Sequence, residues 1–286
     1  MKERKALAMI TATMVIFGTI GIFRRWIPVS SAFLAFARGV IGALFLFVIT
    51  KLRRSGHSGM LSVRQKLLWF GIPGALIGLN WVLLFEAYRY TSVSIATLCY
   101  YMTPTIVILL SPLVLQEALT GRKILCALTA VIGMVLISGV FSDHGNTGYA
   151  GILLGLGAAM LYSMVILINI KAPEADVYEK TTIELAAAAL VLLPYILVSE
   201  GFSLSGIAPS SIVLILFVGI VHTGIAYALY FAGIPHLKAQ TTALFSYIDP
   251  VTALFLSAVL LHEPLSGTGL LGAVLIRGSA VLSELL

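Results

Sequence analysis

Long apolar runs, separated by short polar and charged segments, follow one another from end to end of this chain. Each run is about 20 residues long, which is the length that an α-helix needs to cross the hydrocarbon core of a bilayer. The pattern therefore predicts an all-α integral membrane protein with ten transmembrane helices, at residues 6–23, 31–50, 67–88, 91–115, 122–141, 148–170, 181–199, 211–233, 238–261 and 266–286.

The chain also contains an internal duplication. Residues 98–136 and 244–282 align without a gap at an offset of 146 residues, and 13 of the 39 aligned positions are identical. Apolar bias explains matched leucines, but it does not explain Pro, Glu and Gly in register. The fixed points of the alignment are Tyr101/Tyr247, Pro104/Pro250, Ser111/Ser257, Leu115/Leu261, Glu117/Glu263 and Gly121/Gly267.

Ten spans divide into five for each copy, and an odd number of crossings turns the second copy upside down in the membrane. We therefore predict two inverted five-helix repeats, at residues 1–141 and 148–286. Inverted repeats of this kind are a transporter architecture, in which the substrate binds near the midplane where the halves meet.

Composition and charge fit this prediction. Hydrophobic residues make up 59% of the 286 residues and charged residues only 10%, which is outside the range of soluble domains. Thirteen Lys and Arg fall in the N-terminal segment and the loops on its side, whereas the opposite loops hold only Arg24, Arg25 and Arg89. The positive-inside rule then places both termini in the cytoplasm, with the protein in the plasma or inner membrane. This topology accounts for the net charge of +6, so no nucleic-acid partner is expected.

Motifs of catalysis and cofactor binding are absent from the sequence. It has no phosphate-binding loop, no His-Glu-x-x-His, no Gly-x-Ser-x-Gly and no clustered metal ligands. Cys99 and Cys126 both lie inside predicted spans, so neither a disulfide nor a thiolate metal site is expected. We expect no enzyme activity, cofactor or metal. The rival functions are an intramembrane lipid enzyme with Asp249 and His222 as acid and base, which lacks a nucleophile, and a receptor or scaffold, which the short loops disfavour.

Two related segments carry a family resemblance. Tyr-Met-Thr-Pro at 101–104, Leu-Gln-Glu-Ala-Leu at 115–119 and Gly121 are repeated as Tyr-Ile-Asp-Pro at 247–250, Leu-His-Glu-Pro-Leu at 261–265 and Gly267. With Ala-Arg-Gly at 37–39, this pattern resembles the ten-span, EamA-type branch of the drug/metabolite transporter superfamily over nearly the whole chain.

The resemblance implies alternating-access export of small metabolites, often amino acids or related compounds, with export of drugs or other organic solutes as the alternative. It also implies that spans five and ten buttress the bundle from outside the central cavity. Related four-span multidrug exporters use a membrane-embedded Glu in their first helix. Span one has Thr11, Thr13 and Met14 at that depth, so cation exchange by that route is not expected.

Prolines within spans four and nine predict two helix kinks. Pro104 and Pro250 donate no backbone hydrogen bond, and they free the carbonyls of Tyr100 and Ser246, four residues earlier. Since the prolines are equivalent in the repeats, both kinks could face one central cavity and offer those carbonyls to a ligand. The alternative is that the kinks only shape the bundle.

Span nine carries a polar stripe at helical spacing, formed by Thr242, Ser246, Asp249 and Thr252. An isolated charge is costly at the depth of Asp249, which must therefore be paired, protonated or exposed to an aqueous cavity. His222 and Arg277 fall at nearly the same depth. A pair with His222 would couple a proton to the site, and a fixed pair with Arg277 is an equally good structural alternative.

Arg38 is the second intramembrane charge of interest, since Ala35, Gly39 and Gly42 leave room around its guanidinium for a carboxylate. That carboxylate could belong to a substrate, or to Glu86 in a gate at the outer face. Glu184, the repeat equivalent of Arg38, is expected to be an ordinary residue near the cytoplasmic face.

Aromatic residues cluster near these polar positions and predict a cavity with apolar walls and a few orienting polar groups, suited to an amphipathic zwitterion. The predicted substrate-binding residues are Arg38, Asn80, Trp81, Tyr100, Tyr101, His222, Tyr227, Ser246 and Asp249. The predicted function is a secondary transporter that exports a small molecule, most plausibly an amino acid, while one repeat rocks against the other. Protons, through Asp249, His222 or Glu86, are a candidate coupling ion; downhill diffusion is the alternative, and the oligomeric state stays open.

Overall fold

The computed structural model describes residues 3–52, 61–137, 148–199, 208–260 and 267–285. These residues form helices joined by short connections, with no β-strand among them. The first repeat contains α1 (Glu3–Gly18), α2 (Ile20–Arg25), α3 (Ser31–Leu52), α4 (Val63–Lys66), η1 (Leu67–Gly71), α5 (Ile72–Tyr90), α6 (Val93–Tyr100), α7 (Thr103–Leu115) and α8 (Gly121–Ile137). The second contains α9 (Tyr149–Lys171), α10 (Val177–Ser199), α11 (Pro209–Phe217), η3 (Val218–Ile225), α12 (Ala226–Gly233), η4 (Ile234–His236), α13 (Ala239–Ser246), α14 (Ile248–Leu260) and α15 (Gly267–Leu285).

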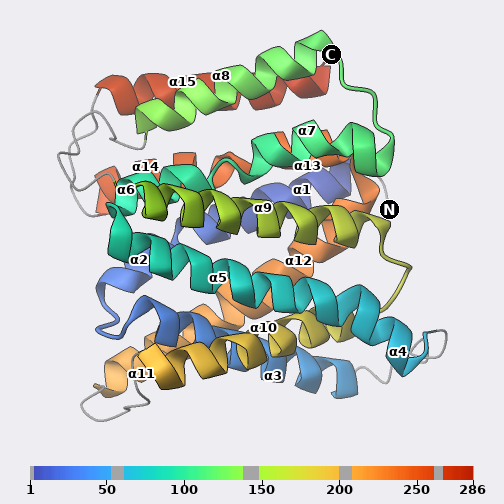
Figure 1. Cartoon of the computed structure of the whole chain (residues 1–286), viewed down its shortest axis with the longest axis vertical. Helices are drawn as coiled ribbons and strands as arrows, with labels where there is room; N and C mark the ends of the chain where they lie inside the picture. The colour runs from blue at the N-terminus through green and yellow to red at the C-terminus, as the bar shows by residue number, and fades with distance from the viewer. Residues whose placement is uncertain (1–2, 53–60, 138–147, 200–207, 261–266, 286) are drawn as a thin grey trace.

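The two repeats correspond helix by helix along the whole chain. The starts of α1 and α9, α3 and α10, α4 and α11, α6 and α13, and α8 and α15 all differ by 146 residues. This is the offset that the sequence shows only for residues 98–136 and 244–282. In Figure 1, α1 begins at the right-hand end of the bundle and α9 begins at the left-hand end. The prediction of two inverted repeats is confirmed.

Every predicted span coincides with a helical segment, and eight of these segments in the described chain are long and apolar enough to cross a bilayer. α8, with 17 residues, and α15 are not among the eight, so the count of ten spans stays a prediction. Two boundaries were wrong: α4 begins at Val63, four residues before the predicted start of the third span, and α10 begins at Val177, four residues before the predicted start of the seventh. Lys180, which we assigned to a loop, therefore lies in the helix and is buried.

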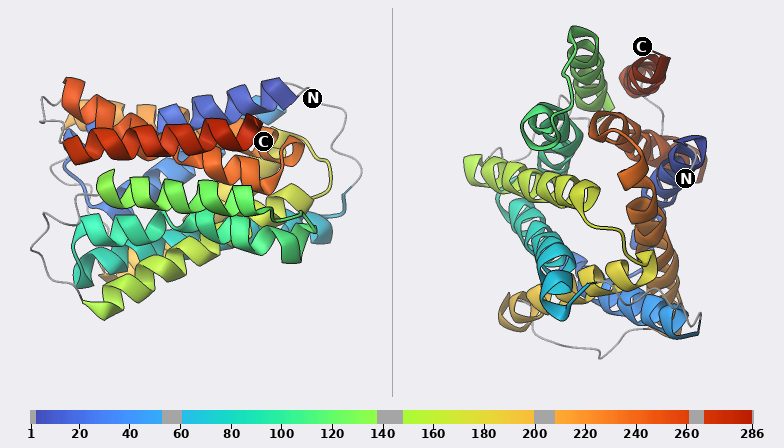
Figure 2. Two further views of the ribbon diagram at one scale, coloured as in Figure 1. Left: turned by 90° about the horizontal axis from the view of Figure 1, so that it is seen from above. Right: turned by 90° about the vertical axis from the view of Figure 1, so that its right-hand side faces the viewer.

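Seen along the helices, α8 and α15 form a pair at one end of the molecule and the other helices make up the main bundle (Figure 2). Packing follows the repeat. α9 packs on α5 as α1 packs on α12, and α10 packs on α5 as α3 packs on η3. α3 and α10, which are repeat equivalents, pack on each other, and so do α8 and α15.

Glycines allow the closest of these helix contacts. A Cβ at Gly78 would lie 2.7 Å from the carbonyl oxygen of Ala188 in α10, and one at Gly155 would lie 2.8 Å from Cβ of Cys99 in α6. Gly74 and Gly151 face the same partner segments. Small residues at this spacing let two backbones approach closely in lipid. The glycine pairs therefore serve packing within one bundle.

The predicted kinks are complete breaks placed just before the prolines. α6 ends at Tyr100 and α7 begins at Thr103, so Pro104 lies in the first turn of α7, where its missing N–H costs no hydrogen bond. Pro250 likewise lies in the first turn of α14. The Thr103 hydroxyl donates a hydrogen bond of 2.8 Å to the Tyr100 carbonyl. The Tyr100 carbonyl therefore has a partner within the protein. That the breaks offer the Tyr100 and Ser246 carbonyls to a ligand stays a prediction.

The close approach of α5 and α10 gives a stability prediction. Gly78→Ala places a methyl group against the α10 backbone and should lower the midpoint of thermal unfolding by about 5 °C, the usual result of overpacking by one to two kcal/mol. Gly278→Ala is the control, because nothing lies within 4 Å of a Cβ at that position of α15. Scanning fluorimetry of both variants in detergent is the measurement. Equal midpoints would contradict the packing described here.

Candidate substrate cavity

A cavity of about 540 Å³ lies between the two repeats. Its lining comes from α1, α2, α3, α5, α6, α7, α9, α12, α13 and α14, together with residues at the helix breaks, so both repeats contribute. Among the described residues, none of α8 or α15 lines it. Small-molecule sites have volumes of about 300–1,000 Å³. The cavity is therefore large enough for a small metabolite.

The cavity extends to one end of the bundle, here called the open end, where α2 and α5 end and α3 and α6 begin. Its lining there includes Arg24, Ser31, Tyr88 and Val93. From this end it reaches inward to Ile166, in the second half of α9, and to Tyr230 in α12. The opposite end, here called the closed end, contributes no lining residue among those described.

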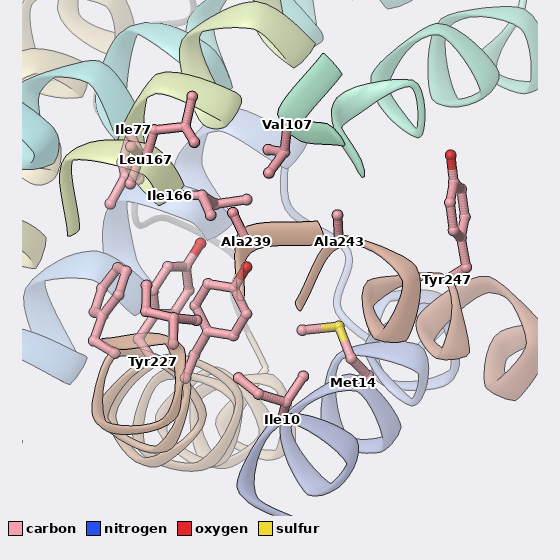
Figure 3. Packing of buried hydrophobic residues seen from close by; sticks show 14 of the residues in the cluster. Ile10, Met14, Ile77, Val107, Ile166, Leu167, Tyr227, Ala239, Ala243 and Tyr247 are labelled. Carbon is pink, nitrogen blue, oxygen red and sulfur yellow. The ribbon is translucent and has the colours of Figure 1, made fainter. Parts of the chain in front are cut away.

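Apolar packing fills the closed end. Figure 3 shows Ile10, Val107, Ile166, Ala239 and Ala243, from four different helices, directed toward a common interior. All five side chains are buried. The packing on α1 is tight as well, because a Cβ at Gly233 would lie 3.0 Å from Cδ1 of Ile10. This plug separates the cavity from the closed end.

Polar contacts across the two repeats reinforce the plug. Glu117, just after α7, accepts hydrogen bonds from the backbone N–H groups of Ala239 at 2.7 Å and Gln240 at 3.4 Å. The first N–H groups of α13 have no acceptor within the helix, and the Glu117 carboxylate accepts their hydrogen bonds as a helix cap. The Gln240 side chain donates to the Ser111 hydroxyl at 2.8 Å. The Leu-Gln-Glu-Ala-Leu segment at 115–119, in the first repeat, therefore binds the start of α13 in the second repeat at the closed end. The equivalent segment of the second repeat, at 261–265, lies outside the described residues.

Arg38 lies in the cavity wall, on α3. Its guanidinium sits over the Trp81 ring, 5.2 Å from the ring centroid, in a cation–π contact. Nε of Arg38 is buried and has no hydrogen-bond partner. A guanidinium offers five N–H donors in a fixed fork that matches a carboxylate. Arg38 is therefore a cation with spare donors beside the cavity.

Asp249 provides the opposite charge, at the start of α14. It lines the same cavity, and the Tyr101 hydroxyl of the other repeat lies close to its carboxyl group. Ser246, one turn earlier, also lines the cavity and donates to the Thr242 carbonyl at 2.9 Å. Of the polar stripe, Thr242 and Thr252 do not line it. The stripe therefore contributes two of its four members.

Aromatic rings form most of the remaining wall. Tyr100 contacts both Tyr101 and Tyr162, each with ring centroids 6.1 Å apart. Phe17 meets Tyr227 edge to face at 5.4 Å. The sequence analysis missed Phe17, and also Phe85 and Tyr88, which line the cavity too. A signal for the α1 face did exist, since its lining residues recur at helical spacing: Met14, Phe17, Gly21 and Arg24.

Seven of the nine predicted binding residues line the cavity: Arg38, Trp81, Tyr100, Tyr101, Tyr227, Ser246 and Asp249. Asn80 and His222 do not. Asn80 is buried and donates to the Ala158 carbonyl at 2.7 Å, which joins α5 to α9. His222 is hydrogen-bonded to Thr19 at 2.6 Å and contacts the rings of Phe23 and Phe217.

Three predicted pairings do not form. His222 is engaged with Thr19 outside the cavity, so it does not pair with Asp249 as a proton-coupled site or as an acid–base pair. Arg277 is exposed on α15 and is likewise not paired with Asp249. Glu86 accepts a hydrogen bond from Tyr195 at 2.7 Å and pairs with Arg89 at 3.0 Å, so it does not pair with Arg38. His222 and Glu86 thus interact with nearer groups, and Arg277 lies on the surface.

The open and closed ends predict different chemical accessibility. In a variant without Cys99 and Cys126, Thr97→Cys places a thiol in the cavity lining, and a water-soluble maleimide should label it within minutes. Ser111→Cys places a thiol at a fully buried position in the closed end, and labelling should be at least about tenfold slower because the thiol needs local opening to react. Labelling of the purified variants, measured by mass shift, checks this. Equal rates would mean that the cavity is not open as described.

Comparisons with known proteins agree with this architecture. The model of the EamA-like transporter family matches residues 4–139 and again residues 149–284. The uncharacterized transporter YxxF of Bacillus subtilis is 27% identical over 90% of this chain and 82% of its own length. An uncharacterized transporter of Archaeoglobus fulgidus is 25% identical over 96% of this chain and 95% of its own, and Protein PecM of Dickeya dadantii is 27% identical over 74% and 72%. A solved crystal structure, 22% identical, has a TM-score of 0.85 and covers 98% of both chains, which shows the same fold.

Proposed function

Because the chain belongs to the EamA-like transporter family, we propose that it exports an amino acid or a closely related amphipathic compound through the cavity between its repeats. The observation that carries the proposal is the pair of opposite charges, Arg38 and Asp249, in one aromatic-walled cavity of about 540 Å³.

The two charges match the two ends of a zwitterion. The spare N–H donors of Arg38 suit the substrate carboxylate, since bidentate guanidinium–carboxylate contacts are among the stronger hydrogen bonds in proteins. The Asp249 carboxylate, with the Tyr101 hydroxyl beside it, suits the ammonium group. Trp81, Tyr100 and Tyr162 then surround the apolar part of the substrate. No bond is made or broken in this process.

Transport proceeds by alternating access. The open end faces the outside of the cell, because the loops near it carry only Arg24, Arg25 and Arg89 of the positively charged loop residues. Both termini are then cytoplasmic. The closed end, held by Glu117 and the apolar plug, is the inner barrier. Rocking of one repeat against the other opens this barrier and closes the outer end, as inverted repeats allow.

Export of drugs or other organic solutes is the second candidate, favoured by the aromatic walls alone. It differs from the first in one respect: a neutral or cationic drug has no carboxylate for Arg38. The charge requirement at position 38 therefore separates the two functions.

Transport assays of substituted proteins give the test. In liposomes loaded with a panel of radiolabelled amino acids, the wild-type protein should give saturable flux. Arg38→Ala and Asp249→Asn should each raise KM by about 10- to 100-fold, the usual effect of losing a hydrogen bond to a charged group. Since the bound substrate makes both contacts, exchange of labelled for unlabelled substrate should fall as well.

Arg277→Gln is the matched control, because Arg277 is exposed on α15 and lines no part of the cavity. Its KM should equal that of the wild type. Wild-type flux that persists unchanged in Arg38→Ala would contradict carboxylate recognition. Flux of drugs but of no amino acid would replace the first function by the second.

A further inference from the structure

Glu184 is a fully buried carboxylate that the proposed substrate site does not use. It lies on α10 with 0% of its surface exposed, and neither carboxylate oxygen has a hydrogen-bond partner. It does not line the cavity. A charged carboxylate in such a place would lose its hydration without replacement, which is among the most costly arrangements in a protein.

The charged neighbour of Glu184 does not provide that replacement. Lys180, one turn earlier on α10, is also buried, but the two form no ion pair in the structure. Its ammonium instead lies over the rings of Phe70 and Phe231, at 5.8 Å and 5.6 Å from their centroids. An ammonium over two aromatic faces is partly stabilised by them. Lys180 therefore has its own environment and leaves Glu184 without a direct contact.

The other elements around Glu184 bring few titratable groups in the described chain. η1 and α5 present Phe70 and the backbone at Gly74, and α3 presents Gly39 and Gly42 to the next residue, Leu185. α9 brings Asn169, whose amide is neutral and whose Oδ1 also has no partner. From α12, Tyr227 is a further titratable group close enough to interact with Glu184. Lys66 and Glu179 neutralise each other at 2.6 Å nearby. The form of Glu184 that fits these surroundings is the protonated one.

The inverted repeat indicates in which conformational state Glu184 is exposed to water. Glu184 on α10 and Arg38 on α3 are separated by 146 residues, the same offset that separates the starts of these two helices. Arg38 lines the cavity at the open end in this state. In an inverted-repeat transporter the two halves exchange conformations between the two states. When the closed end opens, Glu184 takes the place that Arg38 holds now, and its carboxyl group faces the cytoplasmic cavity.

We propose that Glu184 is a proton-binding site that links the conformation of the transporter to cytoplasmic pH: it takes up a proton from the cytoplasm in the inward-open state, and only the protonated form is buried when the outward-open state forms. The inference rests on the alternating access proposed above, but not on the identity of the substrate. The proton is returned to the side from which it came, so the site regulates transport and does not drive it.

The sign of the effect follows from linkage. The outward-open state binds one more proton than the inward-open state at an alkaline cytoplasmic pH, where Glu184 is ionised when it faces water. Raising the cytoplasmic pH therefore disfavours the outward-open state, by up to about tenfold for each pH unit when one proton is involved. Glu184→Gln is neutral in both states and removes this dependence.

Labelling of Thr97→Cys from outside measures the outward-open population directly. The variant, without Cys99 and Cys126, is reconstituted in liposomes with its open end outward, the outer pH is held constant, and only the inner pH is raised. We expect the rate of maleimide labelling to fall several-fold with Glu184 present and to stay constant in Glu184→Gln. Glu179→Gln is the matched control, since it is the same substitution on the same helix at a residue paired with Lys66. It should keep the wild-type dependence.

Infrared spectroscopy tests the protonated state itself. Its main measurement uses the wild-type protein, and the variants serve only to assign the band. With carboxyl-labelled glutamate, the wild-type protein at neutral pH should show an isotope-shifted band of a protonated Glu carboxyl, distinct from any band of Asp249. The band should be missing in Glu184→Gln and present in Glu179→Gln.

A labelling rate that does not depend on inner pH in the wild-type background, or that keeps the same dependence in Glu184→Gln, would overturn the proposal, as would the absence of the glutamate band. Neither measurement requires a transported substrate. If no amino acid is transported but the pH response and the band are found, the proton site stands and the proposed substrate falls.

Discussion

Inside a bilayer, every polar group must find its partner within the protein, because lipid offers none. This constraint explains much of the detail in the structure. Hydroxyl groups in the spans bond back to carbonyls of their own helix or the next one, as Thr13 does to Met9 at 2.9 Å and to Ala226 at 3.3 Å. Where a helix breaks before Pro104, Thr103 donates to the carbonyl that the break leaves. Where α13 starts, Glu117 accepts from the N–H groups.

The same constraint makes the exceptions informative. Arg38 and Glu184 have buried polar atoms without a hydrogen-bond partner, and Asp249 is a third acidic or basic residue of the bundle interior. Arg38 and Asp249 face the cavity, where water or a substrate can complete their contacts. Glu184 faces neither water nor a partner, and a carboxyl group can remove that cost only by holding a proton. Access to the cavity thus decides whether a buried charged group is stabilised by water or substrate, or has to lose its charge by binding a proton.

Much of the fold was predictable because the signals for it are repeated along the chain. The apolar runs predicted the helical segments. Pro104 and Pro250, at equivalent positions of the two aligned segments, indicated both the duplication and the interruptions of the helices. The cavity was predictable where large or charged side chains are rare in spans, as with Trp81, Arg38 and Asp249. Asn80 and His222 looked equally unusual in sequence, but tertiary packing gave them other partners, Ala158 and Thr19. One sequence does not show which way a helix is rotated, and rotation decides between a ligand and a neighbouring helix as the partner.

Arg38 and Glu184 occupy equivalent positions in the two repeats but have side chains of different chemistry. The duplication supplies two positions that exchange environments, but it does not fix what stands there: one copy has a cation and the other an acid. A cation at Arg38 keeps its charge whether it is exposed or buried, because a guanidinium does not lose its proton under ordinary conditions. A carboxyl group can change its charge as its surroundings change. The repeat that carries Arg38 can therefore hold a constant binding charge, while the repeat that carries Glu184 can register on which side the cavity is open.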